Sequence, residues 1–197
     1  MRRWVIGGAV VLLALWCVCW VWFRSATSQD AAVYSVSLHV ESSYTVPGSP
    51  TISAAFINQV LAVYHSPAAG KGQALYDLGV KYGIDPVYAL AFFWHESGFG
   101  TAGEARVTFS PGNERCIEDR PCIDQDRGGY AQMQSWADGF DHWYRLILNL
   151  YVRQWGRVTV AQIIPKYAPT SDGNDEAAYI AAVEQAVDVW RGGQVWV

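Results

Sequence analysis

Apolar residues recur every three or four positions over most of the chain after residue 51, the spacing of amphipathic helices. The pattern predicts helices in segments that begin after polar cap residues and end near glycine or proline. These segments cover residues 52–64, 75–82, 86–97, 135–151, 160–164 and 175–191. Between Gly100 and Gln134 no helical period is sustained, so this part should form a small irregular or β-containing lobe. The fold class predicted is therefore mainly α.

The boundary residues refine these segments. Thr51 or Ser53 is expected to cap the first helix, and Ser135 and Asn174 to cap the two helices that follow them. The helix from residue 160 should stop near Pro165, because proline removes a backbone donor. Gly79 shares a face with apolar residues, which would allow a neighbouring element to approach closely.

The segment 86–97 carries one acid in an almost wholly apolar surrounding. Asp85 and Pro86 predict its start, and Gly98 predicts its end, so Glu96 should lie in the last turn. Burial among aromatic residues and the negative end of the helix dipole would both raise the pKa of Glu96. A carboxylic acid that stays protonated near neutral pH is what a glycosidase uses to protonate a leaving sugar oxygen. The alternative is a glutamate that simply faces water at a helix end.

The N-terminus predicts a membrane anchor. Arg2 and Arg3 precede the uncharged stretch Trp4–Phe23, whose twenty residues match the span of a bilayer core of ~30 Å. The arginines would keep the N-terminus in the cytoplasm, so the rest should lie outside. We therefore expect a transmembrane signal-anchor at 1–24, a linker at 25–51 and a catalytic domain at 52–192. Removal of the leader near residues 26–28 remains the alternative.

Charge and cysteine content narrow the function further. The part of the chain after Arg24 contains all eighteen acidic residues and eleven lysines and arginines, so its net charge is 11 − 18 = −7. A part with this negative charge is a poor candidate for nucleic-acid binding. Cys116 and Cys122 lie in a polar loop that should be outside the cytoplasm, which favours a disulfide. A loop this short would contribute roughly 2 kcal/mol. The ligand types and spacings needed for zinc or calcium are missing, so we expect neither a metal site nor a cofactor.

Three stretches together resemble a known family. The helix end Glu96–Gly100 (Glu-Ser-Gly-Phe-Gly) is similar to that of the lysozyme-like superfamily of peptidoglycan-cleaving enzymes. Ser135–Phe140 resembles the segment that opens the next long helix of this superfamily, and Ile163–Pro169 resembles its late tyrosine-alanine motif. The best match is the bacterial glucosaminidase family, with lytic transglycosylases as relatives, over residues 52–191.

The resemblance implies a lysozyme-like helical domain in which Glu96 is the general acid and Ser97 helps to hold its side chain. It also implies that Tyr167 hydrogen-bonds near the glycosidic oxygen, although a tyrosine packed between helices is the alternative. A second carboxylate could come from residues 101–130, where we favour Asp126 and then Glu114.

Aromatic residues near these motifs could stack on sugar rings, although most tryptophans of a helical domain are expected in its core. The candidates for substrate binding are Phe99, Tyr130 and Trp136. His95 lies beside Glu96 in sequence but on a different helical face, so a structural role is favoured for it.

These features predict a membrane-anchored peptidoglycan hydrolase that acts outside the bacterial cytoplasm, cuts β-1,4 bonds of the glycan strand and uses no cofactor. Its expected partners are the glycan strand and proteins of an envelope complex. Two alternatives stay open. A lytic transglycosylase would use the same acid and give anhydro products. A non-catalytic glycan-binding module would account for the unusual acidic loop.

Overall fold

The computed structural model describes residues 44–197. The expected membrane span Trp4–Phe23 and residues 25–43 of the expected linker lie outside the described residues. Within the described part, no helix combines the length and the apolar character needed to cross a bilayer.

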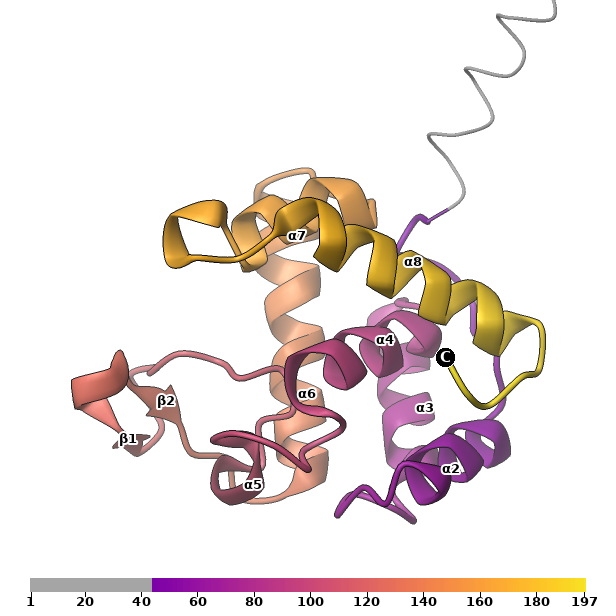
Figure 1. Cartoon of the computed structure of the whole chain (residues 1–197), viewed down its shortest axis with the longest axis horizontal. Helices are drawn as coiled ribbons and strands as arrows, with labels where there is room; N and C mark the ends of the chain where they lie inside the picture. The colour runs from indigo at the N-terminus through magenta and orange to yellow at the C-terminus, as the bar shows by residue number, and fades with distance from the viewer. Residues whose placement is uncertain (1–43) are drawn as a thin grey trace, which may run out of the picture. The chain divides into compact units, whose positions relative to one another are not determined.

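The described residues are mainly α-helical, with one small antiparallel sheet, as the sequence predicts (Figure 1). The longer helices are α2 (Ala54–Val63), α3 (Gly72–Tyr82), α4 (Pro86–Ser97), α6 (Trp136–Leu146), α7 (Val160–Tyr167) and α8 (Glu176–Arg191). The shorter elements are α5 (Ala105–Thr108), β1 (Cys122–Ile123), β2 (Tyr130–Ala131), the 3₁₀ helices η1 (Gln125–Arg127) and η3 (Thr170–Asp172), and the π-helical η2 (Ile147–Gln154).

Helix α4 lies at the centre of the core. It packs against α3, α6 and α8, and every residue from Pro86 to Phe93 is buried. The Asp85 side chain accepts a hydrogen bond from the Val87 N–H, and Gly98 ends the helix in the left-handed conformation with φ 54°. Both boundaries were predicted, because a capping aspartate, a proline in the first turn and a terminal glycine together leave few alternatives.

Other helix boundaries agree in part. Ser53 and Ser135 cap α2 and α6 as expected. The cap of α8 is Asp175 rather than Asn174, because the Asp175 side chain accepts from the Ala178 N–H. The predicted stop near Pro165 is wrong, since α7 continues to Tyr167. Its capping box, formed by Thr159 and Gln162, secures the first turn and offsets the loss of one backbone hydrogen bond.

The predicted linker is too long at its C-terminal end, because residues 44–51 belong to the folded unit. Val46 is fully buried; its N–H donates to the Val158 carbonyl, and its own carbonyl accepts from the Asp85 N–H. Thr51 adds two hydrogen bonds to the Asp85 carboxylate, at 2.6 and 3.0 Å. The Pro-Gly-Ser run does not indicate that this segment is folded, because the hydrogen-bonding partners of Val46 and Thr51 lie far along the sequence.

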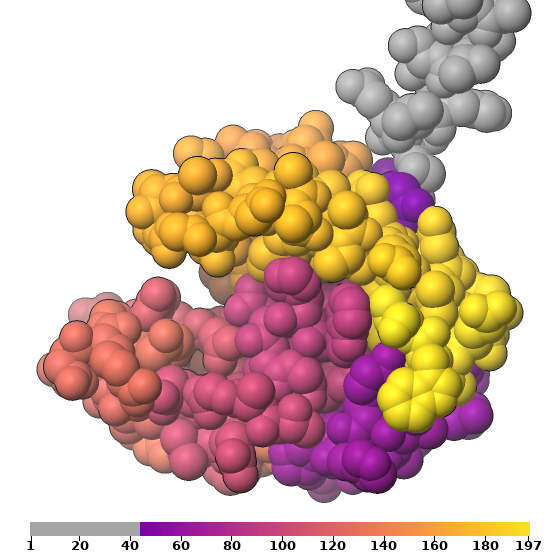
Figure 2. Space-filling view, viewed as in Figure 1, coloured from indigo at the N-terminus to yellow at the C-terminus, as the bar shows by residue number. Residues whose placement is uncertain are grey.

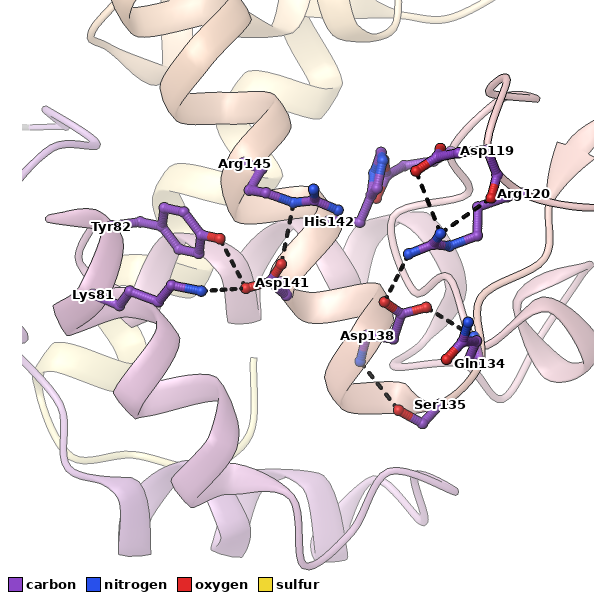
Figure 3. A network of polar contacts seen from close by, with 11 residues as sticks. Lys81, Tyr82, Asp119, Arg120, Gln134, Ser135, Asp138, Asp141, His142 and Arg145 are labelled. Carbon is purple, nitrogen blue, oxygen red and sulfur yellow. Dashed lines mark hydrogen bonds and ion pairs between the residues drawn. The ribbon is translucent and has the colours of Figure 1, made fainter.

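Residues 112–131 form the small lobe expected between α4 and α6. In it, β1 and β2 pair antiparallel with Cys122 opposite Ala131, and a disulfide joins Cys116 to Cys122. The lobe is attached to α6 by an ion pair of 3.0 Å between Arg120 and Asp138, which Figure 3 shows. The predicted disulfide is confirmed, and with the ion pair it fixes one end of the lobe.

Gly79 allows α3 to approach the start of α4. A Cβ atom at this position would lie 2.5 Å from Pro86 Cγ and 2.8 Å from the Ile84 carbonyl oxygen. We therefore predict that Gly79→Ala lowers the free energy of unfolding by about 1–3 kcal/mol through overpacking. Thermal or denaturant unfolding measures the change. Gly48→Ala is the matched control, because its added methyl group would meet nothing within 4 Å. Equal stability of the two variants would contradict this packing.

Candidate active site

A cavity of about 550 Å³ lies between the C-terminal end of α4, the small lobe and the region from α7 to η3. Figure 2 shows the molecular surface hollowed between the lobe and the segment that leads into α8. The acids, bases and tyrosines that line it are Glu96, Glu114, Arg115, Tyr130, His142, Tyr151, Lys166, Tyr167 and Asp172. Residues from distant parts of the sequence therefore meet around Glu96.

The Glu96 side chain is held by hydrogen bonds on both of its oxygens. The Tyr179 hydroxyl, from α8, donates to Oε1 at 2.5 Å. Asn113 Nδ2 lies 3.4 Å from Oε2 and also donates to the Glu96 backbone carbonyl at 2.9 Å. Glu96 is only partly exposed and lines the cavity wall. These contacts fix one orientation of the carboxyl group without covering it.

The environment of Glu96 raises its pKa. Burial is the largest cause, and the hydrogen bonds from Tyr179 and Asn113 and the charge of Arg115 oppose it. Removal from water disfavours the carboxylate, whereas donated hydrogen bonds and a nearby cation favour it. Burial prevails, so the upward shift expected from the sequence is confirmed, and the protonated form persists to higher pH than in an ordinary glutamate.

Residues 111–115, at the start of the lobe, are held by a separate contact at almost every position. Ser97 donates to the Pro111 carbonyl at 2.8 Å, and Tyr167 donates to the Gly112 carbonyl at 2.7 Å. Asn113 contacts Glu96, while Glu114 bonds His142 of α6. A side chain at position 112 would collide with Tyr167 and Trp143, so the close approach requires glycine. This segment, which we call the 111–115 strap, therefore joins α4, α6 and α7 around the cavity.

The structure assigns Ser97 a different task from the one expected. Its hydroxyl donates to Pro111 and accepts from the Gly100 N–H at 2.9 Å, and no hydrogen bond to the Glu96 carboxyl is present. Adjacent residues of a helix point about 100° apart, which explains why Ser97 faces inward while Glu96 faces the cavity. Ser97 thus positions Glu96 indirectly, through the strap.

Three other candidates lie away from the cavity. Asp126 is exposed in η1 of the lobe. Phe99 is buried in the core and packs against Tyr64 and Trp190. Trp136 is also buried, packed edge-on against Phe109. Asp126 is thus misplaced as a second carboxylate, and both aromatic residues are packing residues.

Besides Glu96, three candidates line the cavity. Tyr167 lies on its wall with its ring edge-on to Phe92, so it both packs and reaches the cavity. Tyr130 lines the lobe side, and the Arg115 guanidinium stacks over its ring at 4.8 Å. Glu114, the second choice for a further carboxylate, lines the cavity and is 6% exposed.

Sequence reasoning missed Tyr179, Asn113 and His142. Tyr179 lies 83 residues from Glu96, on a helix that reads as alanine-rich packing. Asn113 adopts φ 50°, and asparagine tolerates this left-handed conformation better than most residues. That tolerance, within a Pro-Gly-Asn run, was the one available signal for a specialised turn.

Comparison with known proteins supports the fold. No protein-family model and no curated protein matches the chain. Two structures of autolysin E from S. aureus are similar, each with a TM-score of 0.55, and the match covers 76% of this chain and 72% of theirs. One, 14% identical, is a complex with the muropeptide NAM-L-Ala-D-iGlu. The other, 13% identical, is a catalytic mutant with a glutamate changed to alanine, in complex with the disaccharide NAG-NAM. The chain therefore shares its fold with autolysin E.

The hydrogen bond from Tyr179 should set how far the pKa of Glu96 rises. Tyr179→Phe removes a donor that favours the carboxylate, so we predict that the pKa of Glu96 moves further upward. Carboxyl NMR titration of isotopically labelled protein measures it directly. Tyr82→Phe is the control, because it removes a comparable tyrosine–carboxylate bond, to Asp141, away from the cavity. An unchanged or lowered pKa in Tyr179→Phe would show that the bond does not stabilise the charged form.

Proposed function

We propose that this chain cleaves the β-1,4-linked glycan strand of bacterial peptidoglycan, with Glu96 as the general acid. The observation that carries the proposal is the position of Glu96: a carboxyl group of raised pKa, fixed on both oxygens and open to a cavity. The fold shared with autolysin E supports the substrate class, because that protein is seen with a muropeptide and with NAG-NAM.

The geometry suits proton donation to a leaving sugar oxygen. Glu96 would give its proton to the glycosidic oxygen as the bond to the anomeric carbon breaks. The resulting carboxylate keeps the hydrogen bond from Tyr179 and a cation, Arg115, within electrostatic reach. Both stabilise the negative charge that appears on Glu96 during the step, so the same contacts that limit its rise in pKa lower the cost of losing the proton.

The cavity itself suits a sugar chain. Its volume of about 550 Å³ lies within the range of small-molecule sites. Tyr130, from the lobe, and Tyr151, from η2, give the cavity flat apolar surfaces. Lys166 and Asn174 add hydrogen-bond donors. Such a mixture of rings and donors matches the alternating apolar faces and polar edges of pyranose rings.

Glu96→Gln should abolish wall cleavage without unfolding the domain. The amide keeps the shape and the contact with Tyr179 but cannot donate the acid proton, so we expect a loss of at least ~10²–10⁴-fold. Mass spectrometry of the products released from purified peptidoglycan measures the cleavage and identifies the end group. Reducing ends indicate hydrolysis, anhydro ends indicate a lytic transglycosylase, and no cleavage by the wild type indicates a binding module.

Asp126→Asn is the matched control for this experiment. It also replaces an acid by its amide, but at an exposed position outside the cavity, so near wild-type cleavage is expected. If Glu96→Gln cleaved at the wild-type rate, the assignment of the acid would be wrong. If Asp126→Asn were inactive although folded, the cavity would not be the complete site.

We further propose that the domain is tethered to the outer face of the cytoplasmic membrane through Trp4–Phe23. The proposal is supported by the length of this uncharged stretch and by the arginines before it. The full-length protein should be recovered from the membrane fraction with its intact mass, and protease added to spheroplasts should remove residues 44–197. Recovery of a soluble form that begins near Gln29 would show instead that the leader is cleaved.

A further inference from the structure

His142 and Glu114 form a buried pair on the wall of the cavity that holds Glu96. His142 belongs to α6 and Glu114 to the 111–115 strap, and His142 Nδ1 hydrogen-bonds Glu114 Oε2. Both residues line the cavity. Asn113, the neighbour of Glu114 in the strap, holds Glu96, so the pair and the acid are linked by adjacent residues.

The two members of the pair differ in their access to the cavity. The Glu114 side chain is 4% exposed, whereas that of His142 is 15% exposed. When Glu114 is ionised and His142 is neutral, the carboxylate can only accept a hydrogen bond, so Nδ1 carries the hydrogen and Nε2 carries a lone pair. Among the described residues no hydrogen bond to Nε2 is found, and this nitrogen is not among the buried unpartnered atoms. The imidazole therefore offers a basic nitrogen, with a carboxylate fixed behind it.

The neighbouring charged groups on α6 are engaged elsewhere. Asp138 pairs with Arg120, and Asp141 pairs with Lys81 and Arg145, as Figure 3 shows along the helix. His142 follows Asp141 directly in the sequence, but its hydrogen bond goes to Glu114 instead. The pair is thus separate from the ion pairs that attach the lobe and α3 to α6.

A purely structural role does not explain the pair well, because the pair leaves a buried polar atom without a hydrogen bond. Glu114 Oε1 is buried and has no hydrogen-bond partner among the described residues. An unpartnered buried acceptor destabilises a fold, because it gives up its hydrogen bonds to water without gaining a partner in the protein. Polar groups that break the packing rules in this way cluster at functional sites.

We propose that His142, oriented by Glu114, is the base that activates water at this site. The inference rests on the proposed function. A water oxygen attacks the anomeric carbon while its proton passes to His142 Nε2, and the carbon–oxygen bond breaks as Glu96 protonates the leaving oxygen. Glu114 stabilises the imidazolium that forms. Solvent then returns the proton from His142 to the Glu96 carboxylate, which restores the starting state and makes the net reaction a hydrolysis.

His142→Asn tests this role. The amide nitrogen of asparagine can take the place of Nδ1 as donor to Glu114, but no basic nitrogen remains where Nε2 was. We expect hydrolysis of purified peptidoglycan to fall by ~10²–10⁴-fold. Azide, an anionic nucleophile that needs no base, should restore cleavage and give a glycosyl azide detectable by mass spectrometry. A purely structural role would show no such rescue.

His65→Asn is the matched control. His65 is exposed in a turn with φ 54°, a conformation that asparagine tolerates, and it does not line the cavity. It should cleave at the wild-type rate, with no azide product. Should His142→Asn fail to fold, Glu114→Gln decides the matter, since the amide oxygen still accepts from Nδ1–H. It should show a smaller loss of rate that azide likewise relieves.

Several results would overturn the inference. They are wild-type turnover in His142→Asn, loss of turnover that azide does not relieve in either folded variant, or anhydro products from the wild type. The last result would leave Glu96 as the acid and remove only the water-activating step. If the wild type cleaves no glycan at all, the proposed function itself fails, and the two failures are therefore distinguishable.

Discussion

The burial of α4 is the constraint on which the rest of the structure depends. This helix is packed between α3, α6 and α8, and only its last turn reaches the cavity. Because the helix is rigid and enclosed, the direction of Glu96 is determined by the core rather than by a flexible loop. The same enclosure removes water from the carboxyl group and so raises its pKa. Packing and acid strength thus have one common origin.

The second element of the site is the 111–115 strap, whose order comes from long-range contacts. Each of its anchoring groups lies on a different helix: Ser97 on α4, His142 on α6 and Tyr167 on α7. An apolar core alone would not hold such a polar segment. The Pro111 and Gly112 carbonyls and the Glu114 Oε2 atom are instead bonded by groups from the helices around the strap.

The helices and the acid were predictable because their signals are local. Asp85, Pro86 and Gly98 define α4 within a few residues, and the apolar run between them indicates burial of the helix that carries Glu96. The prediction of Asp126 as a second carboxylate rests on the same kind of local argument, a turn next to glycines. In this case the local argument failed. The direction of a loop side chain depends on what the loop packs against, and the disulfide-linked lobe directs Asp126 outward. Tyr179 could not be predicted for a related reason, since it meets Glu96 only through the packing of α8 on α4.

The ordered start of the unit also bears on how the domain can be isolated. Residues 44–51 bridge the starts of two helices, because Val46 bonds both Val158, just before α7, and Asp85, the cap of α4. A fragment cut at Ile52 would leave those backbone groups without partners and open the pocket that Val46 fills. It would also remove Thr51 from the buried Asp85 carboxylate and leave Arg191 as the remaining side-chain partner from α8. Recombinant boundaries therefore belong before Tyr44, so that the behaviour of a shorter fragment is not mistaken for a property of the complete folded unit.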